Sequence, residues 1–180
     1  MTSLALKKQL VFYKLYHTNK LNVLVHCIFV PLILFSTLCI LNDVKLYVVS
    51  YNASDLLALI LATTYVLLHF KVGLLASCML GVLTYLLRAN KMIISQKTAW
   101  SIFVLSWIAQ FLGHGVFEKR KPALLDSLFQ SLVIAPFFIL FEYLFILGFL
   151  PDLNKEIQMF VTETIKGSKH AQDRSKPKSN

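Results

Sequence analysis

Cysteine, proline, glycine and acidic residues are all scarce in this chain. Its three cysteines, Cys27, Cys39 and Cys78, lie in apolar runs, which is typical of small packing residues in a reduced setting. We therefore expect neither a disulfide framework nor a thiolate metal site. The six glycines form no phosphate-binding loop and no dinucleotide fingerprint, and there is no nucleophile elbow. These absences count against nucleotide-dependent and serine-hydrolase chemistry.

Acidic residues number only 9 against 18 lysines and arginines, which gives a net charge of +9. The basic residues flank hydrophobic segments or fill the C-terminal tail, an arrangement that suits anionic lipid headgroups. No single basic stretch is interleaved with aromatic residues, so nucleic-acid binding is not expected. Lysines are spread through residues 1–20, which argues against a secretory signal with an uncharged core.

Apolar residues, by contrast, are abundant and make up 57% of the chain, more than a soluble domain needs. We predict an all-α, polytopic helical membrane protein with four to five hydrophobic helices. Residues 1–20 form a basic segment at the membrane interface, and residues 21–150 form the membrane-embedded helical domain. Residues 151–180 form a polar tail that is disordered from Gly167 onward.

Three apolar stretches are each long enough for one crossing of about 20 residues: 21–41, 98–117 and 128–150. We expect Pro31 to kink the first of them. The run 56–87 is too long for one ordinary crossing and is interrupted at Lys71 and Gly73. It predicts two short helices in a tight hairpin, which either cross or re-enter the membrane. The topology and the oligomeric state stay open.

Four of the five histidines lie inside or at the edge of these apolar segments: His17, His26, His69 and His114. A polar, metal-competent side chain at membrane depth is costly, so it indicates function. Imidazole suits iron, zinc and copper. The clustered HxxxH and HxxHH boxes of di-iron hydroxylases and desaturases are absent. One mononuclear site with open positions, of the kind that activates O₂ in iron enzymes, is the most that this set can build.

Two asparagines accompany the first pair of histidines. Asn19, Asn22 and His26 follow an i, i+3, i+7 pattern and share one helical face, so the amides could orient an imidazole. Alternatively, Asn19 caps the helix. On one continuous helix His17 and His26 would face opposite sides. Both can therefore reach one ion only if the helix begins after His17.

A second polar stripe consists of Gln110, His114 and Glu118, at i, i+4 and i+8. The glycines on either side of His114 leave room for close approach to its imidazole. Glu118 is a ligand, an acceptor that fixes the tautomer of His114, or a charge that pairs with the basic residues after it. Glu142 either faces the cavity or bonds a backbone group. We do not expect His170, in the tail, to take part.

Two stretches carry a resemblance to a known family. They are Tyr16-His17-x-Asn19-x-x-Asn22-x-x-x-His26 and Gln110-Phe111-x-Gly113-His114-x-x-Phe117-Glu118-Lys119-Arg120-Lys121-Pro122. With the apolar runs between them, they resemble the fungal 2-hydroxy fatty acid dioxygenase family. This family comprises small multi-pass proteins of the endoplasmic reticulum membrane and has bacterial relatives. The similarity covers most of residues 10–150.

The resemblance implies an Fe(II)-dependent α-oxidation in phytosphingosine breakdown. A 2-hydroxy fatty acid and O₂ would give the fatty acid one carbon shorter. The histidines would hold Fe(II), with His69 either a fourth ligand or a structural turn residue. A cation would neutralise the substrate carboxylate, and the sequence offers three: Lys71, Arg88 and Arg120. The alternatives to this enzyme are a non-enzymatic membrane-shaping scaffold built on the 56–87 hairpin and a small proton or ion carrier.

Overall fold

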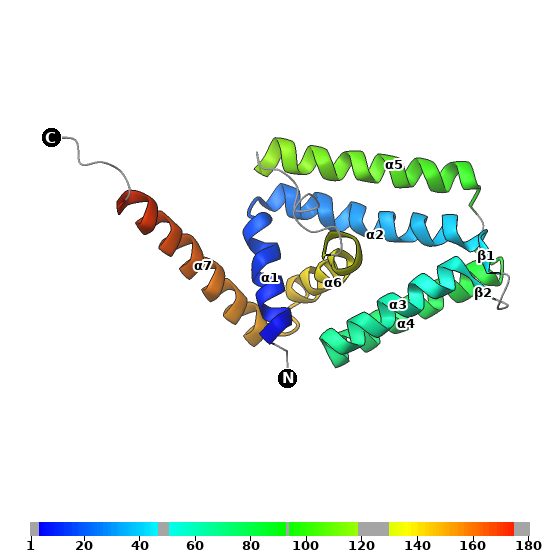
Figure 1. The fold of residues 1–180 in the computed structure, drawn as a ribbon, viewed down its shortest axis with the longest axis horizontal. Coiled ribbons are helices and arrows are strands. Elements are labelled where there is room, and N and C mark those ends of the chain that lie inside the picture. The colour runs from blue at the N-terminus through cyan, green and yellow to red at the C-terminus, as the bar shows by residue number, and fades with distance from the viewer. Residues whose placement is uncertain (1–3, 47–50, 93, 119–129, 175–180) are drawn as a thin grey trace.

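The computed structural model describes residues 4–46, 51–92, 94–118 and 130–174, and this part of the chain is almost entirely helical (Figure 1). The all-α prediction is confirmed, with one small addition: a two-residue antiparallel hairpin in which Lys45 pairs with Asn52. The elements follow in this order: α1 (Leu4–Tyr16), α2 (Lys20–Asn42), β1 (Lys45–Leu46), β2 (Tyr51–Asn52), α3 (Ala53–Leu68), α4 (Phe70–Arg88), α5 (Gln96–Leu112), the π-helical η1 (Gly113–Glu118) and η3 (Gln130–Ile134), α6 (Ala135–Ile146) and α7 (Pro151–Arg174).

Three of the described helices are long and apolar enough to cross a membrane: Lys20–Asn42, Phe70–Arg88 and Gln96–Glu118. A fourth crossing is formed at most by Leu132–Ile146 together with Pro151–Gly167, which are bent by 112°. The chain is thus a polytopic helical membrane protein with three to four candidate spans, where the sequence predicted four to five helices. The α3 helix does not reach the required length, because its 16 residues are fewer than the about 20 that a crossing needs.

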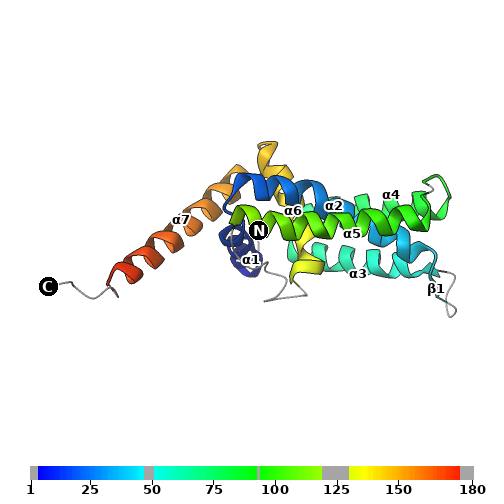
Figure 2. The same cartoon turned by 90° about the horizontal axis from the view of Figure 1, so that it is seen from above.

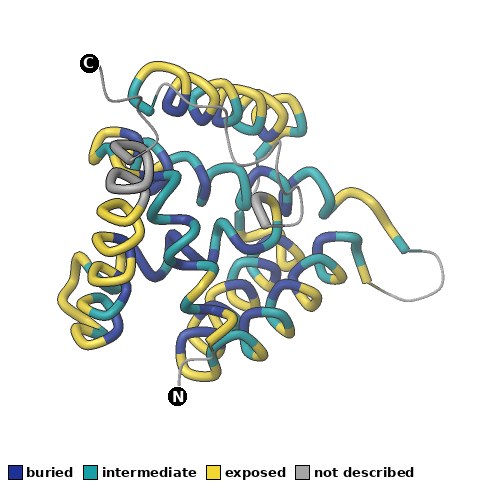
Figure 3. The backbone as a smooth tube through the Cα atoms, turned by 60° about the vertical axis from the view of Figure 1, so that its left-hand side comes forward, coloured by how far each residue is buried: buried dark blue, intermediate teal, exposed yellow. Residues whose placement is uncertain are grey.

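The α5 helix shows how the bundle is packed. Its buried side chains are the small or polar Ala99, Ser106 and Gln110, whereas Leu105 and Leu112 on its outer side are exposed. Small residues let two helix backbones approach closely, and α5 lies alongside α2 in both views (Figures 1 and 2). Exposed residues lie on the outward sides of the helices (Figure 3). These apolar outer faces suit contact with lipid.

The hairpin predicted over residues 56–87 is confirmed as α3 and α4, which pack against each other. The chain reverses at His69, just before Lys71, and the Nδ1 atom of His69 accepts a hydrogen bond from the Val72 N–H at 3.2 Å. Gly73 permits the close packing, because a Cβ atom there would lie 2.2 Å from the carbonyl oxygen of Tyr65.

The α6 helix forms the centre of the core and ends earlier than the sequence predicts for the span 128–150. It ends at Ile146, and Gly148 then takes a positive φ of 80° as the chain changes direction toward α7 (Figure 1). Tyr65 of α3 stacks on Phe137 with ring centroids 4.5 Å apart, and its hydroxyl donates to the Val133 carbonyl at 2.7 Å. The aromatic core of α6 is fully or almost fully buried: Phe137, Phe138 and Phe141.

The C-terminal region differs from the predicted polar tail. Residues 151–174 form the helix α7, which continues past Gly167, where the composition predicted disorder to begin; residues 175–180 lie outside the described residues. The helix packs on α1, and Lys7 forms an ion pair with Glu156 at 2.6 Å. An apolar stripe explains the difference, because such a stripe stabilises a helix of polar overall composition. Its buried members are Leu153, Ile157 and Val161.

We predict that Gly73→Ala destabilises the protein by about 1–3 kcal/mol, because the added methyl group overpacks the α3–α4 contact. Gly81→Ala is the matched control on the same helix, since a Cβ atom there has no neighbour within 4 Å. Thermal unfolding of both variants in detergent measures the difference. Equal melting temperatures for the two variants would contradict the close packing at Gly73.

Candidate metal centre

The break between α1 and α2 places His17 beside the bundle. The first helix ends at Tyr16, and the second begins at Lys20 with Asn19 as its N-cap. The Asn19 Oδ1 atom accepts a hydrogen bond from the Leu21 N–H at 2.8 Å, so the interpretation of Asn19 as a helix cap is confirmed. The chain turns between the two helices, as a shared site for His17 and His26 requires.

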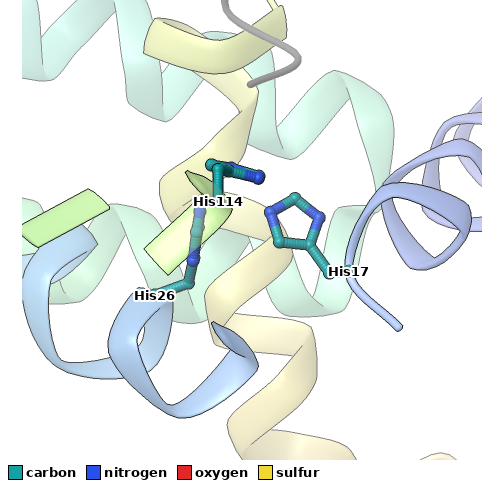
Figure 4. Close-up of side chains that lie close together, drawn as sticks. All are labelled: His17, His26 and His114. Atoms are coloured by element: carbon teal, nitrogen blue, oxygen red, sulfur yellow. The ribbon is translucent and has the colours of Figure 1, made fainter. Parts of the chain in front are cut away.

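Three histidines from three different elements meet at this break (Figure 4). His17 follows α1, His26 lies in the second turn of α2, and His114 lies at the start of η1. Their ring centroids are 4.3 Å apart for His17 and His26, 5.0 Å for His17 and His114, and 4.8 Å for His26 and His114. All three side chains are buried, and one ring nitrogen from each lies within 4.8 Å of the others.

Backbone carbonyls fix the tautomers of two of these histidines. The Nδ1 atom of His17 donates to the Tyr13 carbonyl at 2.8 Å, and that of His26 donates to the Asn22 carbonyl at 2.9 Å. Both Nε2 atoms then carry a free lone pair. Burial also lowers the pKa of His17 to about 4, so its imidazole is neutral at pH 7. A histidine that ligates a metal commonly donates its other N–H to a carbonyl in this way.

The three imidazoles fit one transition-metal ion. The Nε2 atom of His17 and the Nδ1 atom of His114 are buried and have no hydrogen-bond partner among the described residues. Two metal–imidazole bonds of about 2.1 Å put the ligands of one ion at most about 4.2 Å apart. Small side-chain rotations are therefore enough to bring the three nitrogens onto one ion. Three neutral nitrogen ligands suit iron, zinc or copper and leave other coordination positions open.

Glu118 connects η1, which carries His114, to the break between α1 and α2, where His17 lies. Its carboxylate accepts hydrogen bonds from the Asn19 N–H at 2.8 Å, the Thr18 hydroxyl at 2.9 Å and the Asn22 Nδ2 atom at 3.4 Å. These bonds join the end of η1 to the break between α1 and α2. Glu118 is absent from the group of potential ligands that the described residues form, so its contacts are those of a residue that positions the histidines.

The two glycines that flank His114 differ. A Cβ atom at Gly113 would lie 2.6 Å from Oδ1 of Asn22, whereas one at Gly115 would meet nothing within 4 Å. Gly113 therefore allows close approach to α2, and Gly115 does not serve that purpose. The sequence predicted close approach to the imidazole at both positions.

An apolar cavity of about 450 Å³ begins at the three histidines. Gln110, one turn before His114, lines it, is 5% exposed, and has neither side-chain oxygen nor nitrogen paired among the described residues. Tyr13, which the sequence analysis missed, also lines the cavity and stacks on His17 with ring centroids 4.3 Å apart. The i, i+4 spacing of Tyr13 and His17, which directly follows the last residue of α1, was a signal that could have revealed this contact.

Two other sequence candidates lie away from the histidine cluster. His69 caps α4 and contacts Phe141 edge-on with ring centroids 5.7 Å apart, so the structure does not bring it to the other three histidines. Glu142 is buried in α6, and one of its carboxylate oxygens lies 2.8 Å from the ammonium group of Lys14. Glu142 thus neither faces the cavity nor bonds a backbone group through a described contact. The side chain of His170 lies outside the described residues.

Together, the fold and the site define a helical membrane protein with a buried three-histidine centre at one end of an apolar cavity. The chain belongs to the 2-hydroxy-palmitic acid dioxygenase Mpo1-like family, whose profile matches residues 3–147. It is 48% identical over 155 residues to the 2-hydroxy-palmitic acid dioxygenase MPO1 of Saccharomyces cerevisiae. The matched residues make up 86% of this chain and 88% of the yeast protein. No solved structure matches the chain. The family predicted from the two sequence motifs is confirmed.

We predict that His17→Ala, His26→Ala and His114→Ala each lower the affinity for a divalent metal. The loss should exceed the about 10–100-fold that removal of an orienting residue costs, because each change removes one of the three candidate ligands. His69→Ala should keep wild-type affinity and is the matched control. Anaerobic titration of the purified variants with Co(II), followed by visible absorption, measures this. Equal losses for all four variants would place His69 in the centre as well.

Proposed function

We propose that this protein is an Fe(II)-dependent dioxygenase that converts a 2-hydroxy fatty acid and O₂ to the fatty acid one carbon shorter, CO₂ and water. The observation that carries the proposal is the three-histidine centre, with free lone pairs, at one end of an apolar cavity. The yeast relative, named for 2-hydroxy-palmitic acid, supports the substrate class. We place the reaction in the endoplasmic reticulum membrane, in phytosphingosine degradation. No described contact favours the scaffold or carrier alternatives.

The three histidines and the apolar cavity have different roles in the proposed reaction. His17, His26 and His114 would hold Fe(II), which would supply the redox chemistry that activates O₂. Burial keeps the His17 imidazole neutral, and the Tyr13 and Asn22 carbonyls orient the imidazoles of His17 and His26. The apolar walls exclude water and receive the acyl chain, which by itself partitions into lipid rather than water.

The substrate carboxylate meets no lysine or arginine among the described cavity residues. Arg88 lies 3.6 Å from Asp55 and lines a different, polar pocket. Lys71 is absent from the described cavity walls, and Arg120 lies outside the described residues. Neutral donors and the metal centre are then left to receive the head group, and Gln110 is a buried neutral donor beside the histidines.

We assign Gln110 the role of positioning the substrate head group. Its unpaired Nε2 atom can donate to the carboxylate, and its Oε1 atom can accept from the 2-hydroxyl. An unsatisfied buried amide is costly. Substrate binding would remove this cost, because the head group would pair with both polar atoms of the Gln110 side chain. The side chain lies one helical turn from His114, on the buried face of α5.

The reaction itself is tested with protein purified in detergent, loaded anaerobically with Fe(II) and given 2-hydroxypalmitate in air. We expect pentadecanoic acid as the product, measured by mass spectrometry. His26→Ala should abolish product formation while the protein stays folded, because it removes a ligand, and His69→Ala should keep turnover. Absence of product from the Fe(II)-loaded wild-type protein would refute the proposed activity.

Gln110→Met tests the positioning residue, because methionine keeps the shape of the side chain and removes both polar atoms. We expect KM for 2-hydroxypalmitate to rise by about 10–100-fold. This factor corresponds to the loss of a hydrogen bond to a charged group, which contributes roughly 1.5–3 kcal/mol. Metal affinity in the Co(II) titration should stay unchanged. Unchanged KM and kcat would exclude contact between Gln110 and the substrate.

A further inference from the structure

The apolar cavity extends away from the histidines along two antiparallel helices. On α2 its walls carry a single stripe that begins at His26 and ends at Thr37. On η1 and α5 a matching stripe runs back along the chain from His114 to Phe103. The helices are antiparallel, since the amide of Gln96 at the start of α5 donates to Asp43, next to the end of α2, at 2.7 Å. Between these ends the stripes consist of Val30, Ile33, Leu34, Trp107, Gln110 and Phe111.

The two stripes have the same length. At about 1.5 Å per residue, Thr37 lies about 16 Å along α2 from His26, and Phe103 lies about 16 Å along α5 from His114. A saturated chain advances about 1.25 Å per carbon, given bonds of about 1.5 Å at a near-tetrahedral angle. The cavity therefore takes an extended tail of about 13 carbons beyond the histidine end. This is close to the tail of 2-hydroxypalmitate beyond C2.

Three side chains line the far end of the cavity. They are Thr37 of α2, Phe103 of α5 and Leu57 of α3, and no described residue nearer the start of α5 or the end of α2 lines the cavity. Beyond Phe103 the next inward residue of α5 is Ala99, which is fully buried in the helix contact. The hydroxyl of Thr37 already donates to the Ile33 carbonyl at 2.7 Å, so it need not pair with a ligand.

We propose that Thr37 and Phe103, backed by Leu57, set the acyl chain length that this protein accepts. The inference rests on the proposed function for its substrate class, but the length limit comes from the cavity. A methyl terminus that reaches this end fills the cavity, and a longer chain must bend or displace a side chain. A shorter chain forgoes burial, which is worth about fourfold in binding per methylene.

Two variants move the end of the cavity in opposite directions. Thr37→Phe fills it, so the preferred substrate should shift from 2-hydroxypalmitate toward 2-hydroxymyristate or 2-hydroxylaurate. Phe103→Ala extends it, so the preference should shift toward 2-hydroxystearate. We expect the ratio of kcat/KM between neighbouring substrates to change by about tenfold or more, since two methylenes are worth about sixteenfold.

Each variant has a matched control outside the cavity. Thr63→Phe makes the same change at an exposed position of α3, where the hydroxyl likewise donates to the carbonyl one turn earlier, that of Leu59, at 2.8 Å. Val104→Ala shortens an exposed side chain directly after Phe103. Both controls should keep the wild-type chain-length profile.

A second measurement is independent of turnover. Saturated fatty acids from laurate to stearate, which cannot react, are added to the metal-free protein in detergent, and the rise in melting temperature is recorded for each. The length that stabilises most should shift in the two variants in the same directions as the activity. If wild-type protein makes no product but these shifts occur, the proposed reaction fails and the length limit stands. Unshifted profiles in both variants, or no stabilisation by any fatty acid, would overturn the length limit.

Discussion

The hydrogen bonds of Glu118 are the interaction on which the rest of the site depends. A carboxylate near membrane depth is costly unless it is paired, and here three donors, from Thr18, Asn19 and Asn22, surround it. Because these donors lie at the break between α1 and α2, the carboxylate fixes where the chain may turn. The turn brings His17 to His26, and the end of η1 brings His114 to both. The centre is therefore assembled from elements about a hundred positions apart in the chain.

The π-helical geometry of η1 contributes to the same end. Single π-helical turns are frequently found at functional sites. Here the π-helical segment includes both His114 and Glu118. His114 belongs to the histidine cluster, while Glu118 bonds the N-terminal end of α2. The close approach of Gly113 to Asn22 completes this junction.

The packing of the bundle keeps the polar groups of the site apart from the apolar outer faces of the helices. The inner face of α5 buries small and polar residues, and that of α2 buries small and polar residues together with Val30 and Leu38, so the two helices pack closely and can hold polar groups beside the centre. Exposed apolar side chains such as Leu105 and Leu112 face outward, where they suit contact with lipid. The cavity is apolar along most of its length; its histidines and Gln110 lie at one end, and the hydroxyl of Thr37 at the other end is paired with the Ile33 carbonyl. A lipid substrate with one polar end matches this gradient, because each part of it meets surroundings of its own kind.

The sequence by itself determined the all-α class, the tight hairpin and the family, because apolar run lengths and motif spacings are local properties. It also identified the three histidines of the centre as candidates. It did not separate them from His69, since all four lie at similar depth in apolar segments and only packing shows that His69 caps α4 beside Phe141. Nor did it reveal α7, whose apolar stripe is diluted in a polar composition. The cavity and the pairing of Glu142 with Lys14 were decided by the tertiary structure alone, because both join helices that are distant in the chain.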